Sequence, residues 1–225
     1  PTNRHRWPVA DQVDLQQRHR GEKQAALGLL AWTQRYRALL NPTTVFDLER
    51  HKYLAGVYEC QAAERAIMKP GQSGISEYAV SYALHALDQR RMNVLYMLPT
   101  VGDISDFSQM RIGPALEASQ YLAGLVVDGH ETSKKGTDRV RLKRLRGNFL
   151  VLRGAQVRMG QSGERRGASQ IKAVPADAIV FDEFDEMPPG VEALGEKRLG
   201  HSAMKEQIFL STPTFPGVGI HVKWL

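Results

Sequence analysis

The chain has 225 residues, 42% of them hydrophobic, and a formal net charge of +6. This length can bury the core of one large α/β domain with a small appendage, and the basic balance favours a polyanionic partner such as nucleic acid. A single cysteine, Cys60, excludes an intrachain disulfide and fits a reducing cytosol. Nothing in the sequence resembles a signal peptide, and it contains no run of about 18 apolar residues, so we expect no membrane span.

The first predicted element is a helix from about Val9 to Leu40, which Asn41–Pro42 ends. Its apolar contributors are Leu27, Leu29, Leu30, Trp32 and Leu39. We therefore expect residues 1–45 to form an N-terminal helical appendage or lid, packed on a main domain that spans residues 46–225. Residues 46–62 lead toward a sheet, and their aromatic side chains can simply pack in the core.

A strand at Arg65–Met68, a loop at Lys69–Ser76 and a helix from Ser76 to Arg90 form the next predicted unit. A phosphate-binding loop reads G-x-x-x-x-G-K-[ST] between a strand and a helix. Here Gly74 matches the second glycine and Ser76 the hydroxyl that binds Mg²⁺. Ile75 replaces the lysine, whereas Lys69 replaces the first glycine.

The positive charge has thus moved from one end of this loop to the other. A lysine is a point charge on a flexible stem, so Lys69 can approach the same phosphates from the start of the loop. The N-terminus of the following helix adds free N–H groups for an anion. An ordinary strand-turn-helix connection that happens to carry Gly and Ser is the alternative.

Three further apolar strands end in hydroxyl or acidic residues. Asn93–Leu98 runs into Pro99–Thr100, Ala178–Phe181 into Asp182–Glu183, and Gln207–Leu210 into Ser211–Thr214. Ligands of open α/β sheets bind at the carboxyl ends of the strands. The recurrence therefore predicts a nucleotide site there.

The pair Asp182–Glu183 carries the expected chemistry. In phosphate-handling α/β proteins the first acid helps to hold Mg²⁺ and the second polarises the attacking water. The alternative is a solvated acidic pair at a strand end. Asp185 and Glu186 follow, and we expect a solvated turn there rather than a cage of four carboxylates around one metal.

A basic stretch, Arg139–Arg146, nearly alternates charged with aliphatic residues, which predicts a strand with one wet face. A hairpin follows, turning at Gly147–Asn148 and returning through Phe149–Leu152. Arg139, Arg141 and Arg144 are candidate contacts to a DNA backbone, because phosphate binding needs charge without base readout. An edge strand whose charges prevent edge pairing is the alternative, and it is favoured because no aromatic residue interleaves to stack bases.

As an ordered set, these segments resemble the ATPase domain of the large terminase subunit of tailed bacteriophages, in the branch with a displaced P-loop lysine. The resemblance covers roughly residues 45–225 and is carried by Lys69–Ser76, Met97–Thr100, Gly147–Ala155, Phe181–Glu186 and Leu210–Thr214. It implies a three-layer α/β P-loop NTPase fold of the RecA/ASCE type, with a mostly parallel central sheet and the N-terminal helical appendage.

The resemblance also implies residue roles. Lys69 and the loop that follows cradle the β- and γ-phosphates, Ser76 and Asp182 hold Mg²⁺, and Glu183 orients the hydrolytic water. The loop residues are Gly71, Gln72, Ser73, Gly74 and Ile75, and the motif that couples hydrolysis to DNA movement is Ser211, Thr212 and Pro213. The family's arginine finger falls on Lys172 by spacing, whereas Arg166 matches it by residue type. Tyr53 and Gln61 lie where related ATPases contact adenine.

The implied function is ATP hydrolysis, with ATP and Mg²⁺ as cofactors, that drives double-stranded DNA into a prohead in the host cell cytoplasm. The implied partners are the DNA, a portal protein, a small terminase subunit and copies of the chain in a ring, with no membrane. A nuclease domain is expected beyond Leu225, so this chain should not cleave DNA. Two alternatives remain at this stage, a helicase-like or repair DNA-dependent ATPase and a degenerate nucleotide fold that serves as a DNA-binding or assembly module.

Overall fold

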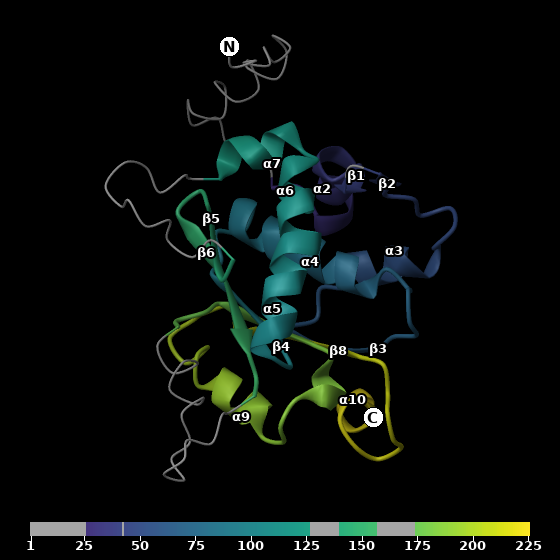
Figure 1. The fold of residues 1–225 in the computed structure, drawn as a ribbon, viewed down its shortest axis with the longest axis vertical. Helices are drawn as coiled ribbons and strands as arrows, with labels where there is room; N and C mark the ends of the chain where they lie inside the picture. Colours follow the sequence, from purple (N-terminus) through teal and green to yellow (C-terminus); the bar gives the residue numbers. More distant parts are fainter. Residues whose placement is uncertain (1–25, 42, 127–139, 157–173) are drawn as a thin grey trace.

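The computed structural model describes residues 26–41, 43–126, 140–156 and 174–225. A six-stranded sheet forms the centre of the molecule, in the order β3-β8-β7-β4-β6-β5 (Figure 1). The strands are β3 (Glu64–Met68), β4 (Val94–Leu98), β5 (Leu142–Leu145), β6 (Asn148–Gly154), β7 (Ala178–Asp182) and β8 (Glu206–Ser211). All neighbouring pairs are parallel except β5 with β6, so the sheet is mostly parallel, as expected.

Helices cover both faces of this sheet (Figure 1). On one face lie α2 (Leu29–Tyr36), α3 (Tyr53–Glu59), α4 (Ile75–Asp88), α5 (Val101–Phe107), the π-helical turn η1 (Ser108–Ile112), α6 (Gly113–Glu117) and α7 (Gln120–Leu125). On the other face lie the 3₁₀ turn η2 (Phe184–Glu186), α9 (Val191–Glu196) and α10 (Ile220–Trp224). No helix of the described residues is long and apolar enough to cross a membrane.

The central strands explain why both faces are covered. Every residue of β4 and β7 is buried, and successive side chains enter opposite cores. Val180 joins the core under α4, whereas its neighbours Ile179 and Phe181 join the core under α9. A strand buried on both faces reads as an unbroken apolar run rather than an alternating one. The predicted three-layer α/β fold is therefore confirmed.

The strand-loop-helix unit forms as predicted, with β3 at Glu64–Met68 and α4 at Ile75–Asp88. Helix α4 begins after Gly74, whose φ of 77° lies in the left-handed region that glycine adopts without steric cost. Ile75 is only 3% exposed and packs in the core. The residue in the usual lysine position thus points into the protein interior.

The N-terminal prediction is partly wrong. Residues 1–25 lie outside the described part of the chain, and the helix in the rest of the segment ends at Tyr36 rather than at Leu40. Leu39–Asn41 instead forms strand β1, which pairs with β2 (Thr44–Val45). The tertiary contacts that hold Arg37 explain the early end, because its buried guanidinium bonds the Leu40 carbonyl and the α4 side chain of Ser81.

The basic hairpin is confirmed as β5 and β6, with its turn one residue earlier than predicted. Arg146 and Gly147, with φ of 50° and 87°, form the two-residue connection. Two positive φ values give the turn the twist that a tight hairpin favours. Strand β5 lies at the edge of the sheet, and β6 connects it to β4.

Candidate nucleotide-binding site

The loop between β3 and α4 is held from two sides. At its start, the Lys69 backbone N–H donates to the Ser211 carbonyl at the end of β8, at 2.9 Å. Further along, the Tyr53 hydroxyl donates to the Ser73 carbonyl at 2.6 Å. Gln72 has a φ of 57°, so a residue other than glycine also adopts the left-handed region here. The loop therefore has a defined shape, fixed by β8 and α3.

The two predicted acids differ in environment. Asp182, the last residue of β7, is 2% exposed, and its Oδ2 accepts a hydrogen bond from the Tyr96 hydroxyl at 2.7 Å. Burial, followed by the charge of Asp182, raises the pKa of Tyr96 well above its usual value, so the phenol remains a donor. Glu183 has a φ of 59°, in the left-handed region, and its side chain is 38% exposed. The backbone thus turns the second carboxylate away from the strand and toward solvent.

The Lys69 ammonium joins the loop to both acids. Its Nζ lies 3.0 Å from Ser76 Oγ, 2.8 Å from Asp182 Oδ1 and 2.7 Å from Glu183 Oε1. Burial alone would lower the pKa of Lys69, but the charges and hydrogen bonds of Asp182 and Glu183 outweigh it and raise this pKa. Ser76, Asp182 and Glu183 are therefore brought together around the ammonium of Lys69, and the sequence predicted these four residues as one site.

The same geometry suits a magnesium ion. A hydroxyl oxygen of Ser76 and a carboxylate oxygen of Asp182 both lie within 3.0 Å of one point, the Lys69 nitrogen. Mg²⁺ is typically held by one or two carboxylates together with substrate phosphates. Among the described residues, no group of three or more His, Cys, Asp or Glu side chains could hold a metal ion.

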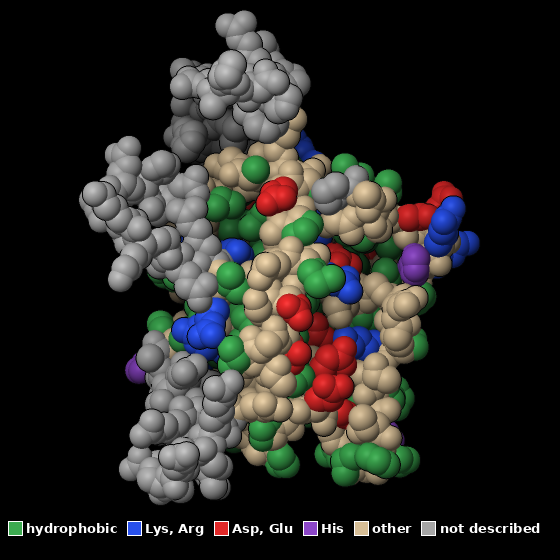
Figure 2. Space-filling view, in the orientation of Figure 1, with side chains coloured by type: hydrophobic (Ala, Val, Ile, Leu, Met, Phe, Trp, Pro, Cys, Tyr) green, Lys and Arg blue, Asp and Glu red, His purple; other side chains and the backbone are tan. Residues whose placement is uncertain are grey.

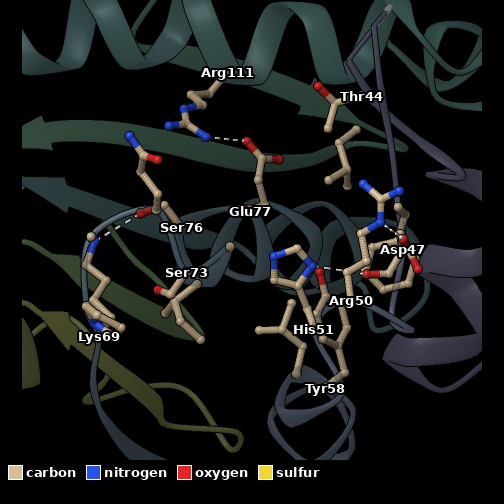
Figure 3. Close-up of a pocket in the computed structure, with 18 of the residues that line it drawn as sticks. Thr44, Asp47, Arg50, His51, Tyr58, Lys69, Ser73, Ser76, Glu77 and Arg111 are labelled. Carbon is tan, nitrogen blue, oxygen red and sulfur yellow. Dashed lines mark hydrogen bonds and ion pairs between the residues drawn. The ribbon is translucent and has the colours of Figure 1, made fainter.

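A cavity of about 1090 Å³ opens beside this cluster (Figure 3). Lys69, Ser73, Ser76 and Arg111 lie at one end, and Asp47, Arg50 and His51 at the other. The lining consists of residues 69–77, residues 43–47, Leu40, Arg50, His51, Leu54, Tyr58, Arg111, Glu183 and Thr212. The cavity thus runs from Glu183 and the loop before α4 to the β1–β2 hairpin, with room for an elongated ligand.

Two predicted adenine contacts are not among the lining residues. The Tyr53 hydroxyl donates to the Ser73 carbonyl of the loop, and the exposed Gln61 amide donates to the Glu59 carbonyl. Arg166, Lys172 and Arg139 lie outside the described residues. Arg144 is exposed on β5 and stacks over Phe149 at 4.7 Å, and Arg141 is half-buried beside β6. An aromatic ring therefore does lie beside the basic strand β5, and it belongs to Phe149 of the neighbouring strand β6.

The end of β8 meets the acidic turn. Ser211 is buried, its hydroxyl accepts from the Asp185 backbone N–H at 3.1 Å, and Thr212 lines the cavity. The expectation of a solvated turn is wrong for Asp185. Its carboxylate accepts from the N–H and hydroxyl of Thr214, both at 2.9 Å, and from the Ile220 N–H at 2.6 Å. Asp185 thus fastens the segment 212–220 to the turn that carries Glu183.

The sequence alone did not predict the far end of the cavity or the ion pair between Glu77 and Arg111. No local sequence pattern identifies Arg111 as a site residue. The strand before it, β4, leads into Thr100, and the Thr100 side chain caps the N-terminus of α5. The charged residues around Asp47 and Arg50 show no helical or strand periodicity that would have pointed to a site. These residues come together only because α4, the β1–β2 hairpin and η1 meet over the loop.

Comparisons with known proteins identify a family and structures with a similar fold. A family model described as "Phage terminase large subunit gpA, ATPase domain" matches residues 49–224, whereas no curated protein matches the chain. The large terminase ATPase domain of Thermus phage P74-26 has a TM-score of 0.54 and 16% identity, covering 80% of this chain and 69% of that one. The large terminase of bacteriophage HK97 has a TM-score of 0.61 and 11% identity, covering 88% of this chain and 40% of that one.

The two structures share the fold, and this chain spans less than half the length of the HK97 protein. The family match includes the loop at Lys69–Ser76, the acids at Asp182–Glu183 and the strand end at Ser211. It spans more than half of the chain. The chain therefore belongs to the family of ATPase domains of the phage terminase large subunit gpA, whose function is ATP-driven packaging of DNA.

Proposed function

We propose that MgATP binds in the cavity with its triphosphate over the loop 69–76. Lys69 leaves the acids to contact the β- and γ-phosphates, helped by the amides of Gly71, Gln72, Ser73, Gly74 and Ile75. The observation that carries the proposal is the contact of one ammonium with Ser76, Asp182 and Glu183. When bound, Mg²⁺ would be held by Ser76 and Asp182 and would neutralise phosphate charge.

Glu183 then has the role of orienting and activating the attacking water. Its side chain is partly exposed and turned toward the cavity, and release of the Lys69 ammonium leaves the carboxylate free to accept a proton from the water. A cation supplied by Arg166 or Lys172 stabilises the charge that spreads over the transferring phosphoryl group. A guanidinium suits that spread charge better than an ammonium, which favours Arg166.

The coupling motif is Ser211, Thr212 and Pro213. Thr212 lines the cavity, and Ser211 contacts both the loop start and the acidic turn, so this strand end can respond to the state of the phosphates. Through it, hydrolysis would move double-stranded DNA into the prohead. The proposed partners are that DNA, a portal protein, a small terminase subunit and neighbouring copies in a ring, in the host cell cytoplasm.

The test is the ATPase rate of the wild type against Lys69→Ala and Glu183→Gln. The assay should include DNA and portal-bearing proheads, because a finger supplied by a neighbouring subunit acts only in the assembly. We expect Glu183→Gln to lower kcat by roughly 10²-fold or more, since positioned acid-base groups contribute that much. Lys69→Ala should abolish detectable turnover.

Glu186→Gln is the matched control, because Glu186 is an exposed carboxylate three residues from Glu183. It should turn over at the wild-type rate. Wild-type rates for both Lys69→Ala and Glu183→Gln would show that the roles assigned to these residues are wrong.

Contacts to the DNA backbone are proposed for Arg139, Arg141 and Arg144. Arg144 is exposed at the edge of the sheet, and its stacking on Phe149 supports a fixed guanidinium. Arg144→Ala should weaken DNA binding equally for unrelated sequences and reduce the slope of log affinity against log salt by roughly one unit. An unchanged slope would favour the edge-protection alternative.

A further inference from the structure

Arg111 is a basic residue in the cavity to which the proposed function gives no task. It lies in η1, the π-helical turn between α5 and α6. π-Helical turns are rare in proteins, and those that occur often lie at functional sites. Its side chain is 49% exposed and lies at the cavity end that holds Lys69 and Ser76 (Figure 3).

The guanidinium is held close to the phosphate-binding loop by Glu77. Arg111 Nη1 donates to Glu77 Oε1 at 2.7 Å, and Glu77 directly follows Ser76 in the first turn of α4. A guanidinium has five N–H donors in a fixed fork that matches phosphate oxygens. The bond to Glu77 uses one of these donors, so most of the fork can still bind an anion.

Glu77 keeps a partner if Arg111 leaves. Its other oxygen, Oε2, accepts from Arg37 at 3.0 Å, and the Arg37 side chain is fully buried. Arg37 is itself fixed by Ser81 and by the Glu77 and Leu40 carbonyls. Arg37 is thus the structural partner of Glu77. The half-exposed pair with Arg111 contributes little net stability and can be exchanged.

A bound nucleotide would bring negative charge to this end of the cavity, and a second cation beside Lys69 would help to neutralise it. In this structure the Lys69 ammonium is paired with Asp182 and Glu183. Figure 2 shows acidic side chains gathered in the middle of the face that carries α5. A nucleoside triphosphate with one divalent cation still carries net negative charge. Arg50, at the other end, is paired with Asp47.

We propose that Arg111 binds the phosphates of the nucleotide, exchanging Glu77 for phosphate oxygens. The exchange ties the segment α5–η1–α6 to occupancy of the site, because the guanidinium belongs to that segment and the phosphates to the loop before α4. This role rests on the proposed nucleotide site, and it concerns a residue in none of the sequence motifs.

The test is a binding titration of the purified chain with adenosine, with MgADP and with a non-hydrolysable triphosphate analogue, adenylyl imidodiphosphate with Mg²⁺. Arg111→Ala should weaken triphosphate binding about tenfold, which corresponds to about 1.4 kcal/mol. The affinity for adenosine should stay within about twofold, because no phosphate is present to meet the guanidinium. Arg111→Lys should recover part of the loss, since it keeps the charge without the fork.

Lys197→Ala is the matched control. It also removes one positive charge, but from an exposed position at the end of α9, on the opposite face of the sheet. Circular dichroism and the Tm of each variant show whether the fold is kept. If Arg111 merely ties η1 to α4, Arg111→Ala will lower the Tm and leave the ratio of triphosphate to adenosine affinity at the wild-type value.

The outcomes separate the two proposals. Wild-type binding together with an unaltered affinity ratio in both Arg111 variants overturns the role of Arg111 alone. Failure of the wild-type chain to bind either nucleotide overturns the nucleotide site as well. A selective loss of phosphate-dependent affinity, absent from Lys197→Ala, supports the contact.

Discussion

At the scale of single residues, the displaced lysine has a structural explanation. Ile75 stands where a phosphate-binding loop usually has its lysine, and here that side chain is 3% exposed in the main core. A long charged side chain at this position would lose its solvation without a partner. Lys69, at the other end of the loop, instead reaches the acids from the end of β3.

We therefore predict that Ile75→Lys does not restore a conventional loop. The buried ammonium should lower the free energy of unfolding by about 3 kcal/mol or more, in the range of unpaired charges placed in cores. Ile75→Val, the control, should cost only about 0.5–1.5 kcal/mol. Urea unfolding measures both. Recovery of ATPase activity in the double variant Lys69→Ala/Ile75→Lys would contradict this explanation.

His85 gives a prediction for pH. Burial lowers the pKa of His85 below its ordinary 6.5, with a further lowering from Arg90, although the bond to the Leu27 carbonyl and the charges of Asp88 and Glu206 oppose this. Below pH 6.5 the unfolded chain therefore binds a proton that the folded chain does not. The contribution to stability is complete above this pH and is lost as the pH falls toward the folded-state pKa.

The measurement is the free energy of unfolding of the wild type and of His85→Gln at about pH 8 and about pH 5.5. The advantage of the wild type should shrink at the lower pH, because only the unfolded wild-type chain gains stability by protonating an imidazole that the folded chain keeps neutral. All other titrating groups are common to the two proteins. An advantage that grows at the lower pH would mean that His85 is charged in the folded state.

At the scale of elements, the link between the acidic turn and the end of β8 is the main finding that the motifs did not predict. The Asp185 carboxylate holds Thr214 and Ile220, while its backbone N–H bonds Ser211. Gly219 lies against it so closely that a Cβ there would come within 2.3 Å of Asp185 Oδ1. The segment 212–220 is thus shaped around one carboxylate.

We predict that Asp185→Ala releases this segment. Loss of a charged acceptor of three hydrogen bonds should cost about 2–3 kcal/mol, and the amides of Thr214 and Ile220 should exchange hydrogen faster. Hydrogen exchange read by NMR or mass spectrometry measures this. Glu186→Ala, at the exposed neighbouring carboxylate, should leave both amides unchanged. Equal exchange in Asp185→Ala and the wild type would rule out the clamp.

At the scale of the whole molecule, the N-terminal segment and the sheet share one core. Trp32 is fully buried, its indole N–H donates to Asp88 Oδ2 at 2.8 Å, and its ring meets His85 edge-on. Asp88 also pairs with Arg146 from the hairpin turn. The proposed appendage, residues 1–45, therefore includes a helix that is a part of the domain's packing.

Trp32→Ala should lower the free energy of unfolding of the whole domain by about 3–5 kcal/mol, as large core truncations do. Circular dichroism and fluorescence should still give one common urea transition, because the helix and the sheet unfold together. Trp224→Ala, at a residue 57% exposed, is the control and should change stability by less than about 0.5 kcal/mol. Two separate transitions in the wild type would mean that the appendage folds independently.

Much of this molecule could be inferred from its sequence. The strands β3, β4, β7 and β8 were visible as short apolar runs, and the helix α4 as a helical period, because burial on both faces of a sheet or along a helix leaves a local pattern. The residues at the strand ends followed from the same reasoning. The family match then decides for the packaging ATPase over the helicase-like and inert alternatives.

Other features depended on the order of the strands and on which side chains it brings together. Lys69 and Asp182 are 113 residues apart and meet because β8 lies between β3 and β7. The partners of Asp185, the early end of α2 and the position of Arg111 over the loop follow from packing between elements distant in the chain. Local periodicity reports only how each element is buried. The tertiary structure alone decides which charges face each other.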